Sequence, residues 1–135
     1  MVVLDSSFLV AYHNARDVHH ESAAHLMEEI TAGRWGPAVL LEYVFLEVVT
    51  VLLVRRGLPA AVAASEVLLQ ARELEFVPGA RLFLDAVDRF QRQQGTSLSF
   101  TDAAIAVWAS RSGEGFVATF DNEFRKVRGI KVLPE

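Results

Sequence analysis

Four acidic side chains stand at places in the chain where carboxylates could do chemistry. Asp5 and Asp121 each directly follow a short, β-like apolar run. Asp102 stands at the start of a helix-like run, and Glu47 lies within a strongly apolar one. Hard divalent cations prefer oxygen ligands, and Mg²⁺ takes one or two carboxylates together with water and substrate phosphate. If the fold brings the four acids together, we expect them to hold Mg²⁺ or Mn²⁺ for phosphodiester chemistry.

Three of these acids also have ordinary structural explanations. Asp5 precedes a helix-like run and could accept hydrogen bonds from free helix N–H groups as an N-cap. Asp102 lies in a first helical turn, where the helix dipole favours a negative charge. Asp121 stands in a segment typical of a turn. Taken singly, each is therefore weak evidence for a metal site.

Glu47 is harder to explain as a structural residue. Its helical neighbours three and four positions away carry no positive charge, so no helical ion pair is available. These neighbours are Tyr43, Val44, Thr50 and Val51. A lone carboxylate among apolar side chains is costly unless it is paired or bound to a metal. The alternative is that it lies on a solvent-facing stripe with Thr50. Glu42 competes for the same role, but its place in the first turn of the predicted helix is explained by the dipole.

Short β-like runs alternate with longer helical runs along the chain. The predicted strands are Met1–Leu4, Leu74–Val77, Gly115–Phe120 and Ile130–Leu133, with Pro37–Leu40 as a weak strand or a lead-in to a helix. The predicted helices are Ser6–Tyr12, Val18–Thr31, Leu41–Arg56, Ala60–Ala71, Arg81–Gln94 and Thr101–Ser112, and Asp121–Lys126 is a helical turn. Gly57, Gly95 and Gly113 follow three of these helices, as helix-ending glycines do.

This alternation predicts an α/β fold with a mostly parallel sheet covered on both faces. Right-handed crossovers place the carboxyl ends of all the strands at one edge of such a sheet, where ligands bind. Asp5 and Asp121 would lie at that edge. The length of 135 residues predicts a single domain, residues 1–135.

The composition excludes several kinds of function. The chain has no cysteine, which excludes disulfides, zinc–thiolate sites and a thiol nucleophile. It has a net charge of −4, so binding of nucleic acid would require a bound cation, a local basic patch or a basic partner. No apolar run is long enough to span a bilayer, and the start of the chain lacks the features of a signal peptide. We expect a cytoplasmic protein without membrane contact.

The four acids lie in sequence motifs whose order and spacing, over nearly the whole chain, resemble a PIN domain, the ribonuclease fold of VapC-type toxins. The motifs are Val2-Val3-Leu4-Asp5-Ser6-Ser7, Tyr43-Val44-Phe45-Leu46-Glu47-Val48-Val49-Thr50-Val51-Leu52, Leu98-Ser99-Phe100-Thr101-Asp102-Ala103-Ala104-Ile105-Ala106 and Ala118-Thr119-Phe120-Asp121-Asn122-Glu123-Phe124. The resemblance implies a three-layer α/β/α fold and a ribonuclease that uses Mg²⁺ or Mn²⁺. It implies products with 5′-phosphate and 3′-hydroxyl ends.

The resemblance also implies roles for particular residues and partners. The family's four acidic positions match Asp5, Glu47, Asp102 and Asp121, and all four are expected to be catalytic metal ligands. A shift in register would select Glu42 instead of Glu47, although the segment that follows favours Glu47. Ser7 matches a small hydroxyl position beside the first aspartate, and Thr119 is expected to support it, although a strand threonine can simply pack. A cognate antitoxin and a homodimer are the expected protein partners.

Basic and aromatic residues are weaker candidates for contacts with RNA. The best basic patches include Arg55, Arg56, Arg125 and Lys126, which could contact phosphates or simply be solvated charges. Trp35 is expected to be exposed, where it could stack on a base, and Trp108 to lie in the core. The histidines are His13, His19, His20 and His25; their spacing is unfavourable for zinc, so we expect them at the surface.

Two other classes of function remain as alternatives. One is a PIN fold that binds RNA or protein without cutting it, although a degenerate domain would be expected to have lost one of the four acids. The other is a Mg²⁺-binding α/β signalling domain, which needs a lysine at a strand end that we do not find. We therefore expect a metal-dependent endoribonuclease, the toxin of a toxin–antitoxin pair.

Overall fold

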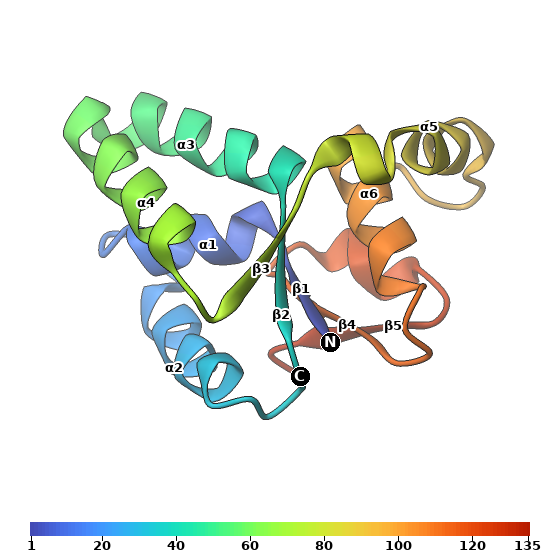
Figure 1. Ribbon diagram of the computed structural model, residues 1–135, viewed down its shortest axis with the longest axis horizontal. Coiled ribbons are helices and arrows are strands. Elements are labelled where there is room, and N and C mark those ends of the chain that lie inside the picture. The colour runs from blue at the N-terminus through green and yellow to red at the C-terminus, as the bar shows by residue number, and fades with distance from the viewer.

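Five parallel strands form the central sheet of the protein, in the order β3-β2-β1-β4-β5. The computed structural model describes residues 1–135 (Figure 1). The strands are β1 (Val2–Leu4), β2 (Ala38–Leu41), β3 (Leu74–Val77), β4 (Gly115–Ala118) and β5 (Ile130–Leu133). The α/β prediction with a parallel sheet is confirmed, and the weak segment before the third helix is a strand.

Six α-helices cover the two faces of this sheet. They are α1 (Ser6–His13), α2 (His20–Thr31), α3 (Glu42–Arg56), α4 (Leu58–Gln70), α5 (Phe83–Arg92) and α6 (Phe100–Ala109). Two short 3₁₀ helices, η1 (Gly79–Arg81) and η2 (Asn122–Lys126), complete the elements. Figure 1 shows α1 to α4 on one side of the strands and α5 and α6 on the other, which is the predicted three-layer arrangement.

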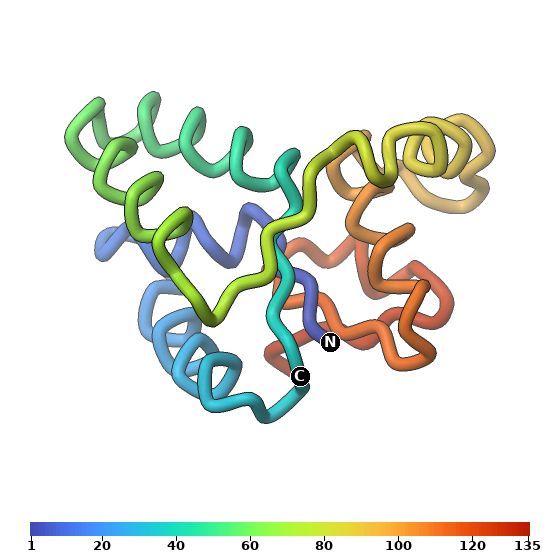
Figure 2. Tube along the Cα trace, viewed as in Figure 1, coloured from blue at the N-terminus to red at the C-terminus, as the bar shows by residue number.

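The burial of each strand agrees with its place in the sheet. Every residue of β1 and β2 is buried, as expected of parallel strands covered on both faces. The edge strands β3 and β5 are each buried mainly at their last residue, Val77 and Leu133. In Figure 2 the chain begins at the blue strand in the middle of the fold. That strand pairs with β4, more than a hundred residues later, through Val2–Phe116, Val3–Val117 and Leu4–Ala118.

Strand β4 ends two residues earlier than predicted, and side-chain hydroxyls explain why. The N–H of Phe120 donates to Oγ of Ser7 at 2.9 Å, and the N–H of Asp121 donates to Oγ1 of Thr119 at 2.9 Å. These backbone groups are satisfied by side chains rather than by a neighbouring strand. The chain therefore turns away from the sheet just before Asp121.

The fifth helix is shorter at both ends than the predicted 81–94. The 3₁₀ turn η1 precedes it, closed by a bond from the N–H of Leu82 to the carbonyl of Gly79. At the other end the side chain of Gln93 bonds both the N–H and the carbonyl of Leu98. This side chain organises the loop before α6 instead of extending α5.

The two tryptophans differ from each other in burial. Trp108 is buried in α6, as predicted. Trp35 is only half-exposed, because its ring packs against the core near Phe116 and the guanidinium of Arg34 lies over it. The prediction of an exposed ring is therefore wrong. None of the helices combines the length and the apolarity that crossing a membrane requires.

Candidate active site

The four predicted acids line one cavity of about 480 Å³. Asp5 follows β1, Glu47 projects from the middle of α3, Asp102 lies in the first turn of α6 and Asp121 follows β4. Four segments far apart in the sequence therefore contribute one carboxylate each. The remaining wall of this acidic cavity is mainly polar: Ser6, Ser7, Val10, Asp17, His19, Val51, Arg55, Ser99 and Phe120.

Asp5 is held by hydroxyl groups rather than by the helix that follows it. Its side chain makes no capping hydrogen bond to α1, so the N-cap interpretation is wrong. Instead Oδ2 accepts hydrogen bonds from Oγ of Ser7 at 2.8 Å and from Oγ1 of Thr119 at 2.7 Å. Asp5 and Thr119 are each 2% exposed. These bonds fix the direction of a buried carboxylate.

The same two hydroxyls also fix the turn that carries Asp121. Ser7 and Thr119 lie 3.1 Å apart and accept the N–H groups of Phe120 and Asp121. The carboxylate of Asp121 accepts the N–H of Glu123 at 2.9 Å, so it caps η2 while it lines the cavity. The expected supporting positions of Ser7 and Thr119 thus join the first and last acids of the site.

Glu47 and Glu42 occupy different surroundings on α3. Glu47 is half-buried in the wall of the cavity and accepts a hydrogen bond from Oγ of Ser6. Glu42 lies outside the cavity lining, and its Oε1 accepts the N–H of Gly79 at 2.9 Å. Glu42 therefore joins the start of α3 to η1, and Glu47 is the glutamate that the fold turns toward the other acids.

Asp102 has the most perturbed acidity that can be given a value. Oγ of Ser99 caps α6 by accepting the N–H of Asp102 at 3.1 Å. Burial raises the pKa of Asp102 to about 7, and the negative charges of Asp5, Asp121 and Glu47 add to the rise. The pKa of Asp5 is also raised, first by its burial. Both shifts come first from burial, and neighbouring negative charges add to them.

These residues suit a hard divalent cation in the chemistry of their donors. All are carboxylates, and a cation would offset the negative charges of Asp5, Asp121 and Glu47, which add to the effect of burial on the pKa of Asp102. No three Asp, Glu, His or Cys side chains converge closely enough to form a ready-made ligand set. Mg²⁺ needs only one or two carboxylates, with water and substrate oxygens filling its other positions. The arrangement therefore fits a cation held largely through water.

The four basic candidates are distributed unevenly around the acidic cavity. Arg55 lines it, whereas Arg56 does not. Arg125 lines a second, smaller depression of about 230 Å³ beside it. Lys126 points to Glu123 and forms an ion pair of 2.7 Å with it. Arg55 and Arg125 are thus the two basic side chains nearest to the site.

The sequence predicts the histidines at the surface; His19 agrees with that prediction and His13 does not. His19 is exposed but lines the acidic cavity, with its ring stacked on Phe120. His13 is largely buried, which lowers its pKa, and its Nε2 has no hydrogen-bond partner. The position of His19 depends on a loop and had no signal in the sequence.

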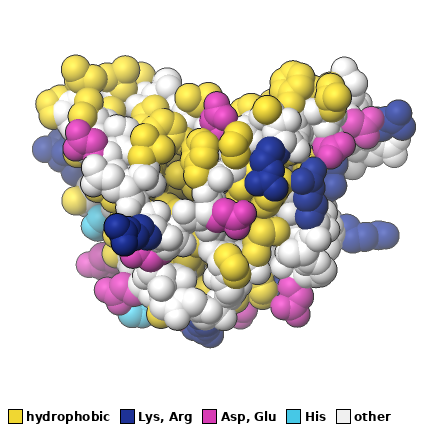
Figure 3. Space-filling view, in the orientation of Figure 1, with side chains coloured by type: hydrophobic (Ala, Val, Ile, Leu, Met, Phe, Trp, Pro, Cys, Tyr) yellow, Lys and Arg dark blue, Asp and Glu magenta, His cyan; other side chains and the backbone are white.

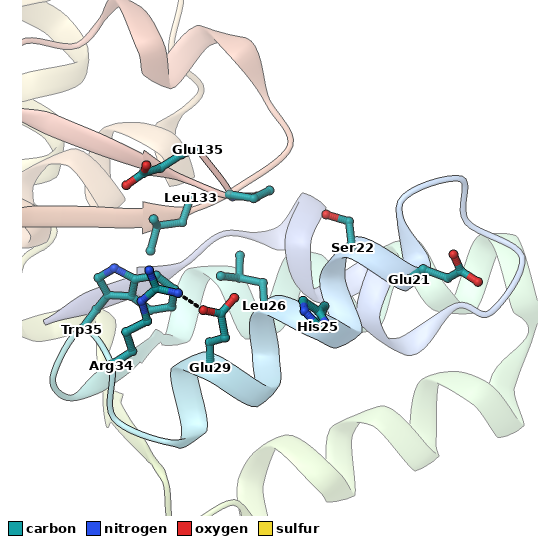
Figure 4. A pocket seen from close by; sticks show the side chains of 10 residues that line it. Glu21, Ser22, His25, Leu26, Glu29, Arg34, Trp35, Leu133 and Glu135 are labelled. Carbon is teal, nitrogen blue, oxygen red and sulfur yellow. Dashed lines mark hydrogen bonds and ion pairs between the residues drawn. The ribbon is translucent and has the colours of Figure 1, made fainter.

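Another cavity, of about 500 Å³, lies between α2 and the C-terminal residues (Figure 4). In it Arg34 forms an ion pair with Glu29 and stacks over Trp35. None of the four acids of the candidate site lines this cavity. Although this cavity is of similar size to the acidic cavity, it is therefore not the candidate active site.

The chain is similar to proteins of known family and structure. Residues 2–130 match the family model described as PIN domain. No match was found among curated proteins.

Three solved structures are similar to the chain. One is Mycobacterium tuberculosis VapC20, described as a sarcin–ricin loop cleaving toxin, at 26% identity and a TM-score of 0.81, covering 93% of this chain and 94% of that one. Another is PAE2754 from Pyrobaculum aerophilum, at 24% identity and a TM-score of 0.58, covering 98% and 88% of the two chains. The PIN domain of T. brucei RRP44 matches at 12% identity and a TM-score of 0.50, covering 98% and 75%. The last two support the fold alone.

Proposed function

This chain belongs to the PIN domain family, and from that premise we propose that it is a Mg²⁺- or Mn²⁺-dependent endoribonuclease. The observation that carries the proposal is that Asp5, Glu47, Asp102 and Asp121 all line one cavity at the carboxyl edge of the sheet. A divalent cation bound among them supplies Lewis-acid chemistry toward a phosphodiester. The net charge of −4 makes such a cation necessary, because the acids alone would repel a phosphate.

The four acids differ in their surroundings, and we assign their roles from these differences. Asp5 is a fixed carboxylate, since Ser7 and Thr119 hold one of its oxygens. Burial raises the pKa of Asp102 to about 7, which allows this carboxyl group to change protonation near neutral pH. Glu47 and Asp121 complete the negative wall. We assign all four to holding the cation and orienting the phosphate and the attacking water.

The partners follow from the same proposal. The substrate is RNA, and the protein is the toxin of a toxin–antitoxin pair whose antitoxin covers the acidic cavity. The similarity to VapC20, described as a sarcin–ricin loop cleaving toxin, supports this role and makes a sarcin–ricin loop hairpin the first RNA to test. A cationic antitoxin side chain would suit the crowded carboxylates.

We also assign a homodimer to the protein, supported by an apolar surface on α3 and α4. Figure 3 shows hydrophobic side chains gathered over the region where these helices lie in Figure 1. A shallow apolar depression of about 360 Å³ lies there, lined by Phe45, Val49, Thr50, Leu53, Leu58, Ala61, Val62 and Ser65. Leu58 is 62% exposed, and contiguous apolar surface of this kind marks protein interfaces.

The proposal is tested by removing single charges from the cavity. Glu47→Gln and Asp102→Asn should each abolish Mg²⁺-dependent cleavage of the hairpin while circular dichroism and thermal unfolding show an intact fold. Glu66→Gln, an exposed glutamate on α4, is the matched control and should cleave like the wild type. Full activity of either cavity variant at saturating Mg²⁺ would contradict the assignment of the active site.

A non-cutting PIN fold that binds RNA or protein is the second candidate. It is favoured by one observation, the lack of three converging ligands in the cavity. A calorimetric titration with Mn²⁺ separates the two candidates. The nuclease should bind Mn²⁺ and lose this binding in Asp102→Asn, whereas a binding module should take up RNA without metal and without cleavage.

A further inference from the structure

The ring of His19 lies flat on the ring of Phe120 at the rim of the acidic cavity. The ring centroids are 4.3 Å apart and the planes differ by 7°. His19 is exposed, and no other aromatic or cationic side chain stacks on it. Its outer face is therefore open to solvent, parallel to a supporting ring.

This stacked pair is fixed in place from both sides. The N–H of His19 donates to Oδ1 of Asp17 at 2.8 Å, which holds the loop before α2. Phe120 is half-buried, packs against Phe8 and has its N–H bound to Ser7. An aromatic platform held in this way can receive another flat ring with little further loss of conformational freedom.

The pair also forms the boundary between two depressions. His19, Phe120 and Asp121 line both the acidic cavity and the smaller depression that contains Arg125. Arg125 is exposed and takes part in none of the ion pairs of the structure, unlike its neighbour Lys126. The smaller depression, about 230 Å³, exceeds the volume of one water several times and has room for a phosphate with its hydration.

We propose that His19 and Phe120 form a stacking subsite for the base of a nucleotide that flanks the scissile phosphate, with Arg125 binding the next phosphate of the same strand. This subsite rests on the proposed function, because the scissile phosphate is placed in the acidic cavity. Bases stack on aromatic rings without regard to sequence, and arginine is suited to phosphate.

The surroundings favour an unpaired RNA strand over other occupants. A base in a duplex is already stacked and cannot present its face to a side chain, whereas a loop or single strand can. The cavity beyond Pro134 contains Glu21, Glu29 and Glu135, and its one arginine, Arg34, is already paired with Glu29, so the excess of negative charge disfavours a further phosphate. The subsite therefore holds one flanking nucleotide and ends there.

Binding is measured with a short, fluorescein-labelled oligoadenylate by anisotropy, with Ca²⁺ replacing Mg²⁺ to limit cleavage. His19→Ala should raise the Kd about 5- to 150-fold, the range for the loss of one base–aromatic stack. His19→Phe should restore affinity, because the flat ring and not the charge is required. His25→Ala, an exposed histidine on α2 outside the acidic cavity, is the control and should bind normally.

Two further readouts separate a direct contact from a structural effect. Oligoadenylates carrying 2-aminopurine at successive positions should lose fluorescence at one position on binding the wild type, and this quenching should disappear in His19→Ala. Arg125→Ala should weaken binding. It should also reduce the slope of log Kd against log salt concentration by the amount expected for the loss of one phosphate contact. Arg128→Ala, an exposed arginine outside both depressions, should leave that slope unchanged.

The outcomes distinguish this subsite from the nuclease proposal. If the wild type cleaves RNA but His19→Ala binds oligoadenylate as well as the wild type does, the subsite is overturned and the nuclease stands. Loss of affinity in His19→Phe equal to that in His19→Ala overturns stacking as well. If binding depends on His19 and Arg125 as expected but neither the wild type nor any variant cleaves, the stacking and phosphate contacts stand as an RNA-binding site and the nuclease proposal fails. A wild type that binds no oligoadenylate overturns the subsite.

Discussion

Oγ1 of Thr119 donates a hydrogen bond of 2.7 Å to Oδ2 of Asp5 across 114 positions of sequence. The two residues directly follow β4 and β1, which are paired neighbours in the sheet. The N–H of Asp5 also donates to the carbonyl of Ala118 at 3.0 Å, so backbone and side chain are fixed together. The pairing of the two strands therefore sets the position of the first acid of the site.

Replacing Thr119 should reveal how much this bond contributes. Thr119→Val keeps the shape of the side chain but removes the donor, and we expect a loss of about 1–3 kcal/mol in the free energy of unfolding because a buried carboxylate loses a partner. Thr119→Ser retains the hydroxyl and should lose less. Urea denaturation measures stability, and hairpin cleavage should fall in the same order. A valine variant as stable and active as the wild type would contradict the positioning role.

The stability of the metal-free protein should depend on Asp102. Its pKa rises from the ordinary 3.8 to about 7 on folding, so the folded state holds the proton more tightly than the unfolded chain does. The contribution of this residue is fully present below about pH 4 and is lost as the pH rises to about 7. Urea denaturation in EDTA across this range should show a steeper decline for the wild type than for Asp102→Asn. Parallel pH profiles of stability for the two proteins would contradict the raised pKa of Asp102.

Metal affinity should have the opposite pH dependence. A cation binds the ionised carboxylate, so below pH 7 it must displace the proton of Asp102. Calorimetry with Mn²⁺ should show affinity rising with pH and levelling above about 7, with proton release in the lower range. Glu66→Gln, outside the cavity, should follow the wild-type curve. An affinity that does not change between pH 5 and 8 would exclude Asp102 from the metal site.

Gly115 should be intolerant of a side chain because β4 passes close to α6. A Cβ at this position would lie 2.7 Å from the carbonyl oxygen of Ala109, which is backbone and cannot move cheaply. Gly115→Ala should lower the free energy of unfolding by about 1–3 kcal/mol, as overpacking does. Gly113→Ala is the matched control, since nothing lies within 4 Å of a Cβ there. Equal stability of the two variants would show that α6 can shift away from the strand.

The apolar surface on α3 and α4 should control assembly. Leu58→Glu places a charge in the apolar depression and should convert a dimer into a monomer by sedimentation velocity. Leu84→Glu changes a leucine that is 78% exposed on α5, on the other side of the sheet, and should leave the dimer intact. A wild type that sediments as a monomer would remove the homodimer from the proposal, and cleavage by that monomer would show that the site does not need it.

The order and kind of the elements follow from local patterns in the sequence. Short apolar runs such as Val2–Leu4 alternate with helical runs, and this alternation is enough to predict a parallel sheet with helices on both faces. Asp5 and Asp121 could be placed near one edge because they directly follow predicted strands. Exact ends were harder to predict: β4 ends at Ala118 because the hydroxyls of the distant Ser7 and the nearby Thr119 accept the N–H groups of Phe120 and Asp121.

The chemistry of the site was determined by the sequence only as a set of residue types. Whether Glu42 or Glu47 faces the cavity depends on the rotation of α3 against the sheet, which packing decides. The pKa of Asp102 depends first on its burial and then on its distance from the other carboxylates, because charge interactions fall with separation. The stack of His19 on Phe120 depends on a loop that meets a strand end a hundred residues away. The sequence by itself thus determined which groups are available, and the tertiary structure decided which of them meet, since these contacts join segments that no local pattern relates.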